Sequence, residues 1–271
     1  LAPLRELCDV TAYETSTPQE IPARVADAEI IFTDSVAIDR AVIAAAPGLK
    51  FVGVMATGVN HIDLETAGER GITVANVPAY STDAVAQHAI ALLLAVTNKV
   101  SEYPQGQPPA DKLSVIPVLL NGKSIGIIGY GNIGRQTAEI AKALGMTVNI
   151  YSRDPEAAVR SDVVSMHCPL TDENRGMIDE EFIGRMKDGA IFINTARGGL
   201  VDEAALAKAL KSGKLFGAGL DVTVNEPIEK DSPLLECDNC FITPHVAFMP
   251  KETREKVVAI AAENLRNYLG I

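Results

Sequence analysis

Residues 123–153 read KSIGIIGYGNIGRQTAEIAKALGMTVNIYSR and carry the strongest fold signal of the chain. A short apolar run leads into Gly129, Gly131 and Gly134, which form the pattern G-x-G-x-x-G. Residues at helical spacing follow, and then a second apolar run at 148–151. Short apolar runs next to glycines are typical of buried strands. The stretch therefore predicts a strand, a tight turn, a helix and a second strand.

Each of the three glycines has a separate physical role in such a turn. Gly129 lets the chain turn sharply, Gly131 leaves room for a pyrophosphate at the backbone, and Gly134 lets the helix pack closely on the strand. The phosphates lie at the helix N-terminus, where free N–H groups and the helix dipole favour negative charge. A glycine-rich turn without a ligand is the alternative, but the flanking strand and helix favour a dinucleotide site.

Length and charge restrict the class of protein. A chain of 271 residues suits two domains, each with its own core. The formal net charge of −11 disfavours nucleic acid and anionic membrane surfaces as partners, because both would repel it. No apolar run reaches the roughly 18 residues of a spanning helix, and the first residues show no signal-peptide pattern. We therefore expect a cytoplasmic protein.

The sequence contains four cysteines, and only Cys237 and Cys240 have the spacing of a metal or redox motif. A second pair of cysteines or histidines that would complete a zinc site is missing. We therefore expect surface thiols at these two positions and no metal site.

The first 80 residues alternate between short apolar strands and helices, which predicts a parallel sheet covered by helices. The strands are expected at 29–33, 49–55 and 72–75, and the helices at 39–46 and 63–70. The chain begins directly with LAPLR, so this sheet is expected to lack its opening strand. A helix at 82–100 is apolar nearly all round, which favours burial between two domains.

A proline-rich linker at 101–118 leads into the second domain. The strands of this domain are expected at 124–129, 148–151, 162–166, 190–194, 215–221 and 240–243, with a helix at 203–211. Only 154–161 separates the second strand from the third, and a parallel crossover needs about a dozen residues. We expect this segment to be too short for a helix. We infer that residues are missing there, at the N-terminus and in the linker.

The last helix, at 251–269, has an apolar stripe that is expected to pack back onto the first domain. We therefore predict a substrate domain that comprises 1–98 with 251–271, and a dinucleotide-binding domain that comprises 99–250.

Three polar side chains follow strand ends of the second domain. Arg197 lies beyond the strand at 190–194, Glu226 lies beyond Asp221, and His245 follows the last strand. Ligands of open α/β sheets bind outside the carboxyl ends of the strands, so these residues can converge. A nicotinamide cofactor needs a group for the anionic end of a substrate and a proton donor for the new hydroxyl. Arginine and histidine supply both.

The remaining three histidines are placed differently along the chain. His167 also ends a strand, and His61 lies in a loop. His88 lies inside the buried helix, where a satisfied core or interdomain histidine is favoured.

Several motifs resemble the D-isomer-specific 2-hydroxyacid dehydrogenases over nearly the whole chain. They are GYGNIG, HCPLT, NTARGGLVDE, LDVTVNEP and TPHVA, with ATGVNHIDL and NVPAYSTDAVAQHAIALLL in the first half. The resemblance implies a Rossmann dinucleotide-binding domain and a flavodoxin-like substrate domain, both doubly wound α/β. It implies an active site between the domains, closure that excludes water, and a homodimer. The chain is most similar to the glycerate dehydrogenase or hydroxypyruvate reductase branch.

The resemblance also implies residue roles in the interconversion of a small 2-oxo acid and a D-2-hydroxy acid such as glycerate. Arg197 would bind the 2-oxo acid, His245 would be the acid/base, and Glu226 would hydrogen-bond the imidazole. Substrate contacts are expected from Thr57, Gly58, Val59 and Tyr80. NAD or NADP contacts are expected from Gly129, Gly131, Asn132, Ile133, Gly134, Ser152, Arg153, Cys168, Pro169, Thr195, Ala196, Arg197, Asp221 and His245. Among these, Asp221 would bind the nicotinamide carboxamide.

The residues at the end of the second strand of this domain bear on the choice between NAD and NADP. An NAD site usually has an acid there for the ribose hydroxyls, but Tyr151 is followed by Ser152 and Arg153. A hydroxyl and a guanidinium suit a 2′-phosphate, which favours dual or NADP use. Asp154 is the alternative, if the turn is one residue longer.

Two other functions are compatible with a dinucleotide domain. A corepressor-like sensor can keep Arg197, Glu226 and His245, but a peptide groove or added tail is not visible in the sequence. An amino-acid dehydrogenase or an NAD-using hydrolase would need a lysine or another base near the nicotinamide, and these motifs supply none.

Overall fold

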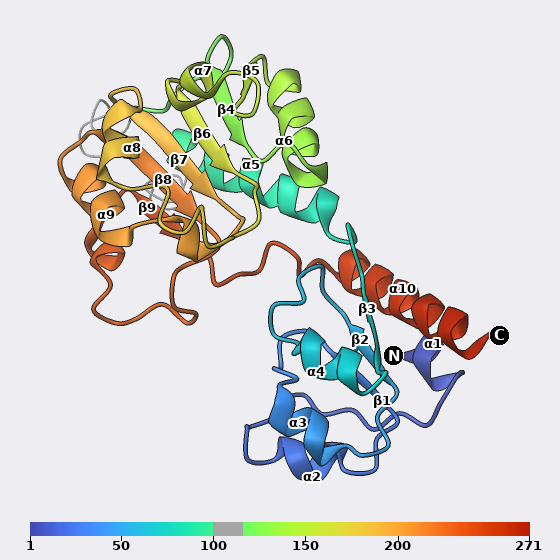
Figure 1. Ribbon diagram of the computed structural model, residues 1–271. Coiled ribbons are helices and arrows are strands. Elements are labelled where there is room, and N and C mark those ends of the chain that lie inside the picture. Colours follow the sequence, from blue (N-terminus) through green and yellow to red (C-terminus); the bar gives the residue numbers. More distant parts are fainter. Residues whose placement is uncertain (100–115) are drawn as a thin grey trace, which may run out of the picture. The chain divides into compact units, whose positions relative to one another are not determined.

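The structure is a computed structural model that describes residues 1–99 and 116–271. The chain divides into two compact units: unit 1 is Leu1–Tyr80 with Pro250–Ile271, and unit 2 is Ser81–Met249. Each unit is built on a parallel sheet with helices on both faces, which confirms the predicted α/β class (Figure 1). The division falls one helix earlier than the boundary predicted after residue 98. The linker predicted at 101–118 lies outside the described residues, except for 116–118.

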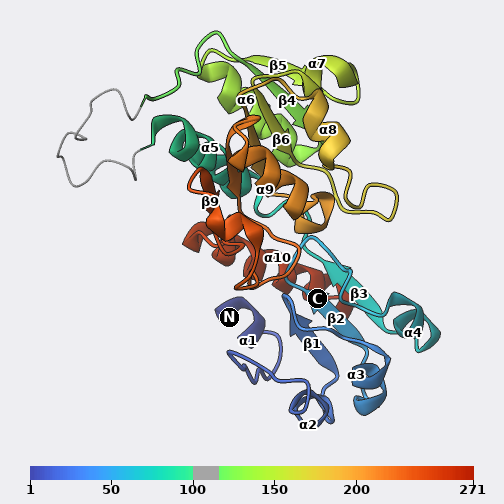
Figure 2. The ribbon, with the colours of Figure 1, turned by 90° about the vertical axis from the view of Figure 1, so that its left-hand side faces the viewer.

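Unit 1 contains a three-stranded sheet in the order β1-β2-β3. The strands are β1 (Ile30–Thr33), β2 (Phe51–Val54) and β3 (Thr73–Asn76). One face is covered by α2 (Ile21–Val25), α3 (Arg40–Ala45) and α4 (Leu64–Glu69), and the other by α1 (Ala2–Arg5) and α10 (Lys251–Leu269) (Figure 2). Because both faces are covered, β2 is buried along its whole length. The three predicted strands and the docking of the last helix are confirmed.

Unit 2 contains a six-stranded parallel sheet in the order β5-β4-β6-β7-β8-β9. The strands are β4 (Ser124–Ile128), β5 (Thr147–Ile150), β6 (Val163–Met166), β7 (Ala190–Asn194), β8 (Leu215–Leu220) and β9 (Cys240–Ile242). All six agree with the predicted strands. The order reverses at β4, which lies between β5 and β6, and such a reversal is where open α/β sheets bind ligands.

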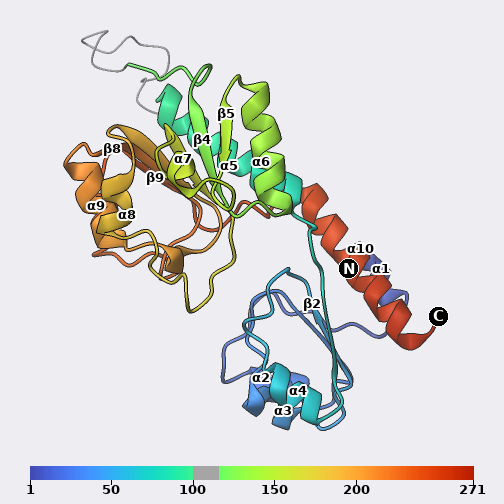
Figure 3. The same ribbon diagram turned by 45° about the horizontal axis from the view of Figure 1, so that its top comes forward.

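Helices cover both faces of the second sheet (Figures 1 and 3). One face carries α5 (Thr82–Asn98) and α6 (Asn132–Ala143), and the other carries α7 (Pro155–Val159), α8 (Glu180–Arg185) and α9 (Glu203–Lys211). Two 3₁₀ helices, η2 (Gly198–Leu200) and η3 (Pro233–Glu236), follow β7 and β8. The polar loops at the carboxyl ends of the strands are therefore held by buried layers on both sides.

The connection from β5 to β6 contradicts one prediction. Residues 154–161 were expected to be too short for a helix, but they contain the five-residue helix α7. Asp154 caps α7 by accepting the N–H of Ala157 at 3.0 Å, and Pro155 fits the first helical position. The whole connection runs from 151 to 162, which is roughly the dozen residues that a crossover needs. The idea that residues are missing from the chain stays a prediction.

This short crossover makes β5 an edge strand of the described sheet. The usual dinucleotide-binding order is 3-2-1-4-5-6. The strand that would lie outside β5 in that order is absent from residues 1–99 and 116–271.

The expectation of surface thiols is also wrong. Cys237 directly follows η3 and packs against α9, so it is only 7% exposed. Its Sγ lies 3.8 Å from the carbonyl oxygen of Ala207 in α9. Burial raises the pKa of Cys240 to about 12. Burial also raises the pKa of Cys237, so both side chains are neutral thiols at physiological pH.

Asp162, just before β6, binds Ser124 at the start of β4 and the side chain of Lys187. Its Oδ2 accepts the backbone N–H and the hydroxyl of Ser124 at 2.9 and 3.0 Å, and its Oδ1 accepts Lys187 Nζ at 2.5 Å. Burial raises the pKa of Asp162, but the hydrogen bonds from Lys187 and Ser124 outweigh this effect and lower the pKa to about 2.

We expect Asp162→Asn to lower the free energy of unfolding by about 2 kcal/mol at pH 7. Because the folded pKa lies below the usual 3.8, the stabilisation is present above that value and is lost as the pH falls toward 2. Urea unfolding across this pH range measures it. The matched variant Asp188→Asn removes a carboxylate that is 91% exposed and should change stability little. Equal losses in the two variants would contradict this account.

Candidate active site

The glycine-rich turn lies between β4 and α6. A Cβ atom at Gly129 would lie 2.4 Å from the backbone nitrogen of Cys168, and one at Gly134 would lie 2.1 Å from the carbonyl oxygen of Gly129. Both positions need glycine because the turn packs on the loop after β6 and the helix packs on the turn. A Cβ atom at Gly131 would meet no described atom within 4 Å. The space above Gly131 is therefore open, as a bound pyrophosphate requires.

The first turn of α6 has free backbone donors. Three other helices of unit 2 begin at aspartates whose carboxylates accept backbone N–H groups, namely Asp154, Asp179 and Asp202. In contrast, α6 begins at Gly131, and no described side chain caps it. Asn132 and Ile133 therefore present N–H groups and the positive end of the helix dipole to a ligand. This arrangement fits a dinucleotide pyrophosphate.

The loop after β7 is held by a buried amide. Asn194 is 0% exposed, and its side chain donates to the carbonyl oxygen of Arg197 and accepts the N–H of Ala196, both at 2.9 Å. The buried hydroxyl of Thr195 has no hydrogen-bond partner among the described residues, which fits a group that contacts a ligand. The exposed guanidinium of Arg197 donates to Ala196 at 2.7 Å and keeps further N–H groups for an anion.

Glu226 and His245 form a hydrogen-bonded pair. Glu226 Oε2 lies 2.7 Å from His245 Nδ1, and the two side chains are 39% and 38% exposed. An ionised carboxylate only accepts hydrogen bonds, so Nδ1 carries the proton and Nε2 is the nitrogen that can exchange one. The ring of Phe248 packs edge-on against the imidazole. The predicted contact is present, while the catalytic roles stay predictions.

Asp221 holds the backbone that carries His245. Asp221 is 1% exposed, and its carboxylate accepts the N–H groups of Val246 and Ala247, both at 2.9 Å. Its carbonyl oxygen accepts the N–H of His245 at 2.8 Å. His245 has a φ of 52°, in the left-handed region that costs a residue other than glycine roughly 1 kcal/mol. The hydrogen bonds of Asp221 stabilise this conformation.

Two further side chains complete the surroundings of Asp221. Thr243 Oγ1 donates to Asp221 Oδ1 at 2.5 Å, and His88 Nε2 lies 2.9 Å from Thr243 Oγ1 and 3.3 Å from Asp221 Oδ1. Burial raises the pKa of Asp221, but the hydrogen bonds from His88, Thr243 and the backbone outweigh burial and lower it. The carboxylate therefore stays ionised. Its predicted contact with the carboxamide stays a prediction.

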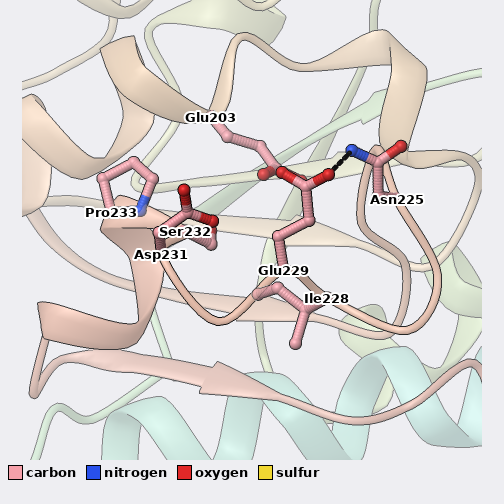
Figure 4. A pocket seen from close by; sticks show the side chains of 7 residues that line it. All are labelled: Glu203, Asn225, Ile228, Glu229, Asp231, Ser232 and Pro233. Atoms are coloured by element: carbon pink, nitrogen blue, oxygen red, sulfur yellow. Dashed lines mark hydrogen bonds between the residues drawn. The ribbon is translucent and has the colours of Figure 1, made fainter.

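The loop that carries Glu226 is held by polar side chains of its own unit (Figure 4). Glu203 of α9 accepts a backbone N–H of this loop at 2.7 Å, and Asn225 donates to Glu229 at 2.9 Å. A cavity of about 130 Å³ lies beside them, and its lining includes the carboxylates of Glu203, Glu229 and Asp231. Negative charge disfavours phosphate and carboxylate ligands, so this cavity suits neither the cofactor nor an anionic substrate.

His167 and Cys168 lie in the loop after β6. Cys168 contacts the turn at Gly129 through its backbone, and Pro169 is exposed. His167 Nε2 lies 2.9 Å from Ser165 Oγ, and its buried Nδ1 has no partner among the described residues. Burial lowers the pKa of His167 to about 4. The ring is therefore neutral near pH 7 and is a poor proton donor there.

The turn after β5 has a cationic character. Ser152 and Arg153 are exposed, and Arg153 Cζ lies 5.7 Å from the centroid of the Tyr130 ring. Arg135 Cζ lies 5.5 Å from the same centroid. Asp154, the alternative ribose ligand, directs Oδ1 to the N-terminus of α7.

The predicted substrate-binding residues of unit 1 lie in and near the loop after β2. Thr57 is exposed, and its carbonyl oxygen accepts Asn76 Nδ2 at 2.7 Å. Gly58 follows Thr57, Val59 packs against the core of the unit, and Tyr80 is 9% exposed. Their contacts with a substrate stay predictions.

Sequence reasoning missed the supporting roles of Asn194, Thr243 and His88. A buried amide at the end of the otherwise apolar strand AIFIN was an available signal for Asn194. No local pattern pointed to the contact between His88 and Thr243, because they are 155 positions apart.

The site combines two functions. An uncapped helix after a glycine turn suits the phosphates of a dinucleotide, and an arginine and a proton-exchanging histidine follow strand ends of the same sheet. These features define a dinucleotide-dependent oxidoreductase.

Comparison with known proteins identifies the family. Residues 90–247 match the model of the D-isomer specific 2-hydroxyacid dehydrogenase, NAD binding domain. The chain is 42% identical to hydroxypyruvate reductase of Blautia hydrogenotrophica over an alignment of 274 residues. This alignment covers 93% of this chain and 85% of the relative. It is 36% identical to glycerate dehydrogenase of Methylorubrum extorquens, over 95% of this chain and 88% of the relative. The chain belongs to the D-isomer-specific 2-hydroxyacid dehydrogenase family.

Solved structures agree with this assignment. The TT0316 protein of Thermus thermophilus has a TM-score of 0.86 and 38% identity, over 94% of this chain and 88% of that chain. An acyclic imino acid reductase in complex with NADPH and D-Arg has a TM-score of 0.83 and 30% identity, over 96% and 88%. The protein is thus an NAD(P)-dependent oxidoreductase that interconverts 2-oxo acids and 2-hydroxy acids. The family predicted from the motifs is confirmed.

We expect His167 to titrate with a pKa of about 4, because burial disfavours its charged form. The chain has four histidines, so their ring proton signals can be followed separately by NMR as the pH is lowered. The matched variant His167→Gln identifies the signal. A midpoint near 6.5 for that signal would contradict the buried environment.

Proposed function

We propose that the protein reduces hydroxypyruvate or glyoxylate with NAD(P)H and, in reverse, oxidises the D-2-hydroxy acid. The observation that carries this proposal is the Glu226–His245 pair beyond the strand ends of the dinucleotide-binding unit. Similarity to proteins named hydroxypyruvate reductase and glycerate dehydrogenase supports the substrate class. The same similarity favours an enzyme over the corepressor-like sensor.

His245 is the acid/base of this proposal. A bound nicotinamide supplies the hydride. His245 Nε2 gives a proton to the carbonyl oxygen of the substrate, and takes it back from the hydroxyl in the reverse reaction. Glu226 accepts from Nδ1, which fixes the tautomer and leaves Nε2 to face the substrate. After each reduction, solvent returns a proton to His245 Nε2.

Arg197 binds the substrate in this proposal. Its planar guanidinium suits a 2-oxo acid, in which a carboxylate and a carbonyl oxygen lie side by side. Asn194 fixes the backbone from which Arg197 extends. In this proposal Thr195 and Ala196 of the same loop flank the nicotinamide, and the unpartnered hydroxyl of Thr195 supports a ligand contact.

We further propose a preference for NADP(H). Arg153 and Arg135 flank the ring of Tyr130 beside the glycine turn, so two cations are near the expected adenosine ribose. The carboxylate of Asp154, which could otherwise bind the ribose hydroxyls, caps α7. The exposed hydroxyl of Ser152 adds a donor for a 2′-phosphate.

The remaining predictions concern the cellular location and the oligomeric state of the enzyme. Four free cysteines support a cytoplasmic location, where thiols stay reduced. Among the described residues no helix has the length and apolar character needed to span a membrane. We propose a homodimer on the basis of the family resemblance, and sedimentation equilibrium measures its mass.

We expect the protein to oxidise NAD(P)H with hydroxypyruvate or glyoxylate, and His245→Ala to lower kcat by about 10²- to 10⁴-fold because the proton donor is lost. Initial rates with a panel of 2-oxo acids, each with NADH and NADPH, measure this. Glu226→Gln should lower kcat as well, whereas the matched variant Glu229→Gln in the same loop should not, because its amide oxygen can still accept from Asn225. Cofactor binding without turnover on any acid would contradict the proposal.

We expect Arg153→Gln to weaken binding of NADPH by about tenfold and to leave that of NADH within threefold, because a hydrogen bond to a charged phosphate is lost. Calorimetry with NADPH, NADH, adenosine 2′,5′-bisphosphate and 5′-AMP measures this without turnover. Arg160→Gln is the matched control, since Arg160 pairs with Glu156 on the surface of unit 2. An unchanged ratio of NADPH to NADH affinity in Arg153→Gln would overturn the preference.

A further inference from the structure

A chain of hydrogen bonds runs from α5 to the backbone of His245. Thr243 Oγ1 lies 2.5 Å from Asp221 Oδ1, so its single hydroxyl proton is directed at the carboxylate. His88 Nε2 lies 2.9 Å from the same hydroxyl oxygen, which is then the acceptor. Nε2 must therefore carry a proton and donate it. Asp221 in turn accepts the N–H groups of Val246 and Ala247.

The helix that carries His88, α5, is packed tightly on the sheet. α5 packs on β8 so closely that a Cβ atom at Gly219 would lie 2.8 Å from Leu92 Cβ. Leu92 and Leu93 are 4% and 1% exposed. His88 lies one turn before Leu92 and keeps 23% of its side chain exposed. The position of its imidazole is therefore set by the buried helix.

The loop that the network holds is under backbone strain. His245 is in the left-handed region, with a φ of 52°, and such strain persists only where the surroundings hold it. The N–H of His245 is bonded to the carbonyl of Asp221, and the next two N–H groups are bonded to its carboxylate. A shift of that carboxylate would therefore move the imidazole of His245 relative to Glu226.

We propose that His88 is a positioning residue for the reaction: by donating to Thr243, it orients the threonine hydroxyl and the Asp221 carboxylate that fix residues 245–247. This inference rests on the proposed function, because it assigns His245 as the acid/base. His88 itself does not touch the substrate in this assignment. A displacement of about 1 Å at a reacting group can cost up to 10²-fold in rate.

The test compares His88→Met, which keeps volume but loses the donor, with His88→Gln, whose side-chain N–H restores a donor. We expect His88→Met to lower kcat by about tenfold or more. The KM for the 2-oxo acid and the affinity for NADPH, followed by nucleotide fluorescence, should stay within threefold. The isotope effect with 4-deuterated NADPH should rise, because the chemical step becomes slower. His88→Gln should recover most of kcat.

A second pair of variants keeps the inference falsifiable if His88→Met does not fold. Thr243→Val removes the hydroxyl without changing the shape, and should also lower kcat, whereas Thr243→Ser should not. The effects of His88→Met and Thr243→Val should not add in the double variant, because both break one network. A kcat within twofold of wild type in His88→Met or in Thr243→Val would overturn the inference, as would equal kcat values for His88→Met and His88→Gln.

The same experiments separate this inference from the proposed function. Undiminished turnover in His245→Ala would refute the proposed function. Loss of turnover in His245→Ala, with none in His88→Met and Thr243→Val, would refute only the positioning role. A parallel loss of NADPH affinity and thermal midpoint in His88→Met would also refute it, because that result indicates a purely structural residue.

Discussion

The ionised carboxylate of Asp221 is buried at the end of β8, where the residue is 1% exposed. An isolated buried charge is costly, and it persists only when hydrogen bonds replace the lost water. The donors come from Thr243 and from the backbone of Val246 and Ala247 in the segment after β9. The charge thus joins two neighbouring strand ends. It also holds His245 in a conformation that the residue would otherwise avoid.

The electrostatics of the site follow from the charge of the whole chain. The formal net charge is −11, yet both the cofactor and the substrate are anions. In the proposed function, binding depends on local donors: the uncapped N-terminus of α6, the guanidinium of Arg197, and the two arginines beside Tyr130. Two acidic side chains near Glu226 hydrogen-bond to the loop that carries it. Glu203 of α9 accepts a backbone N–H of the loop, and Glu229 accepts the side-chain amide of Asn225.

Much of the fold could be predicted because its signals are local. Each strand is a short apolar run, and the role of Gly134 follows from a contact within one turn, whereas Gly129 also packs on the loop after β6. The helix α7 was missed because a five-residue helix has no period to detect, and its aspartate cap and proline were the remaining signals. The pairing of Glu226 with His245 was predictable from strand ends and family resemblance. The contact of His88 with Thr243 was not, since it depends on how closely α5 packs on β8.

A crystal structure of the protein with NADP⁺ and oxamate, an analogue of a 2-oxo acid that cannot be reduced, tests the roles of Arg197 and His245. We predict that the oxamate carboxylate pairs with Arg197 and that its carbonyl oxygen lies within hydrogen-bond distance of His245 Nε2. We also predict that the contact between His245 Nδ1 and Glu226 is kept. Oxamate bound away from Arg197, or an imidazole that has turned from Glu226 with Nε2 directed elsewhere, would contradict the account.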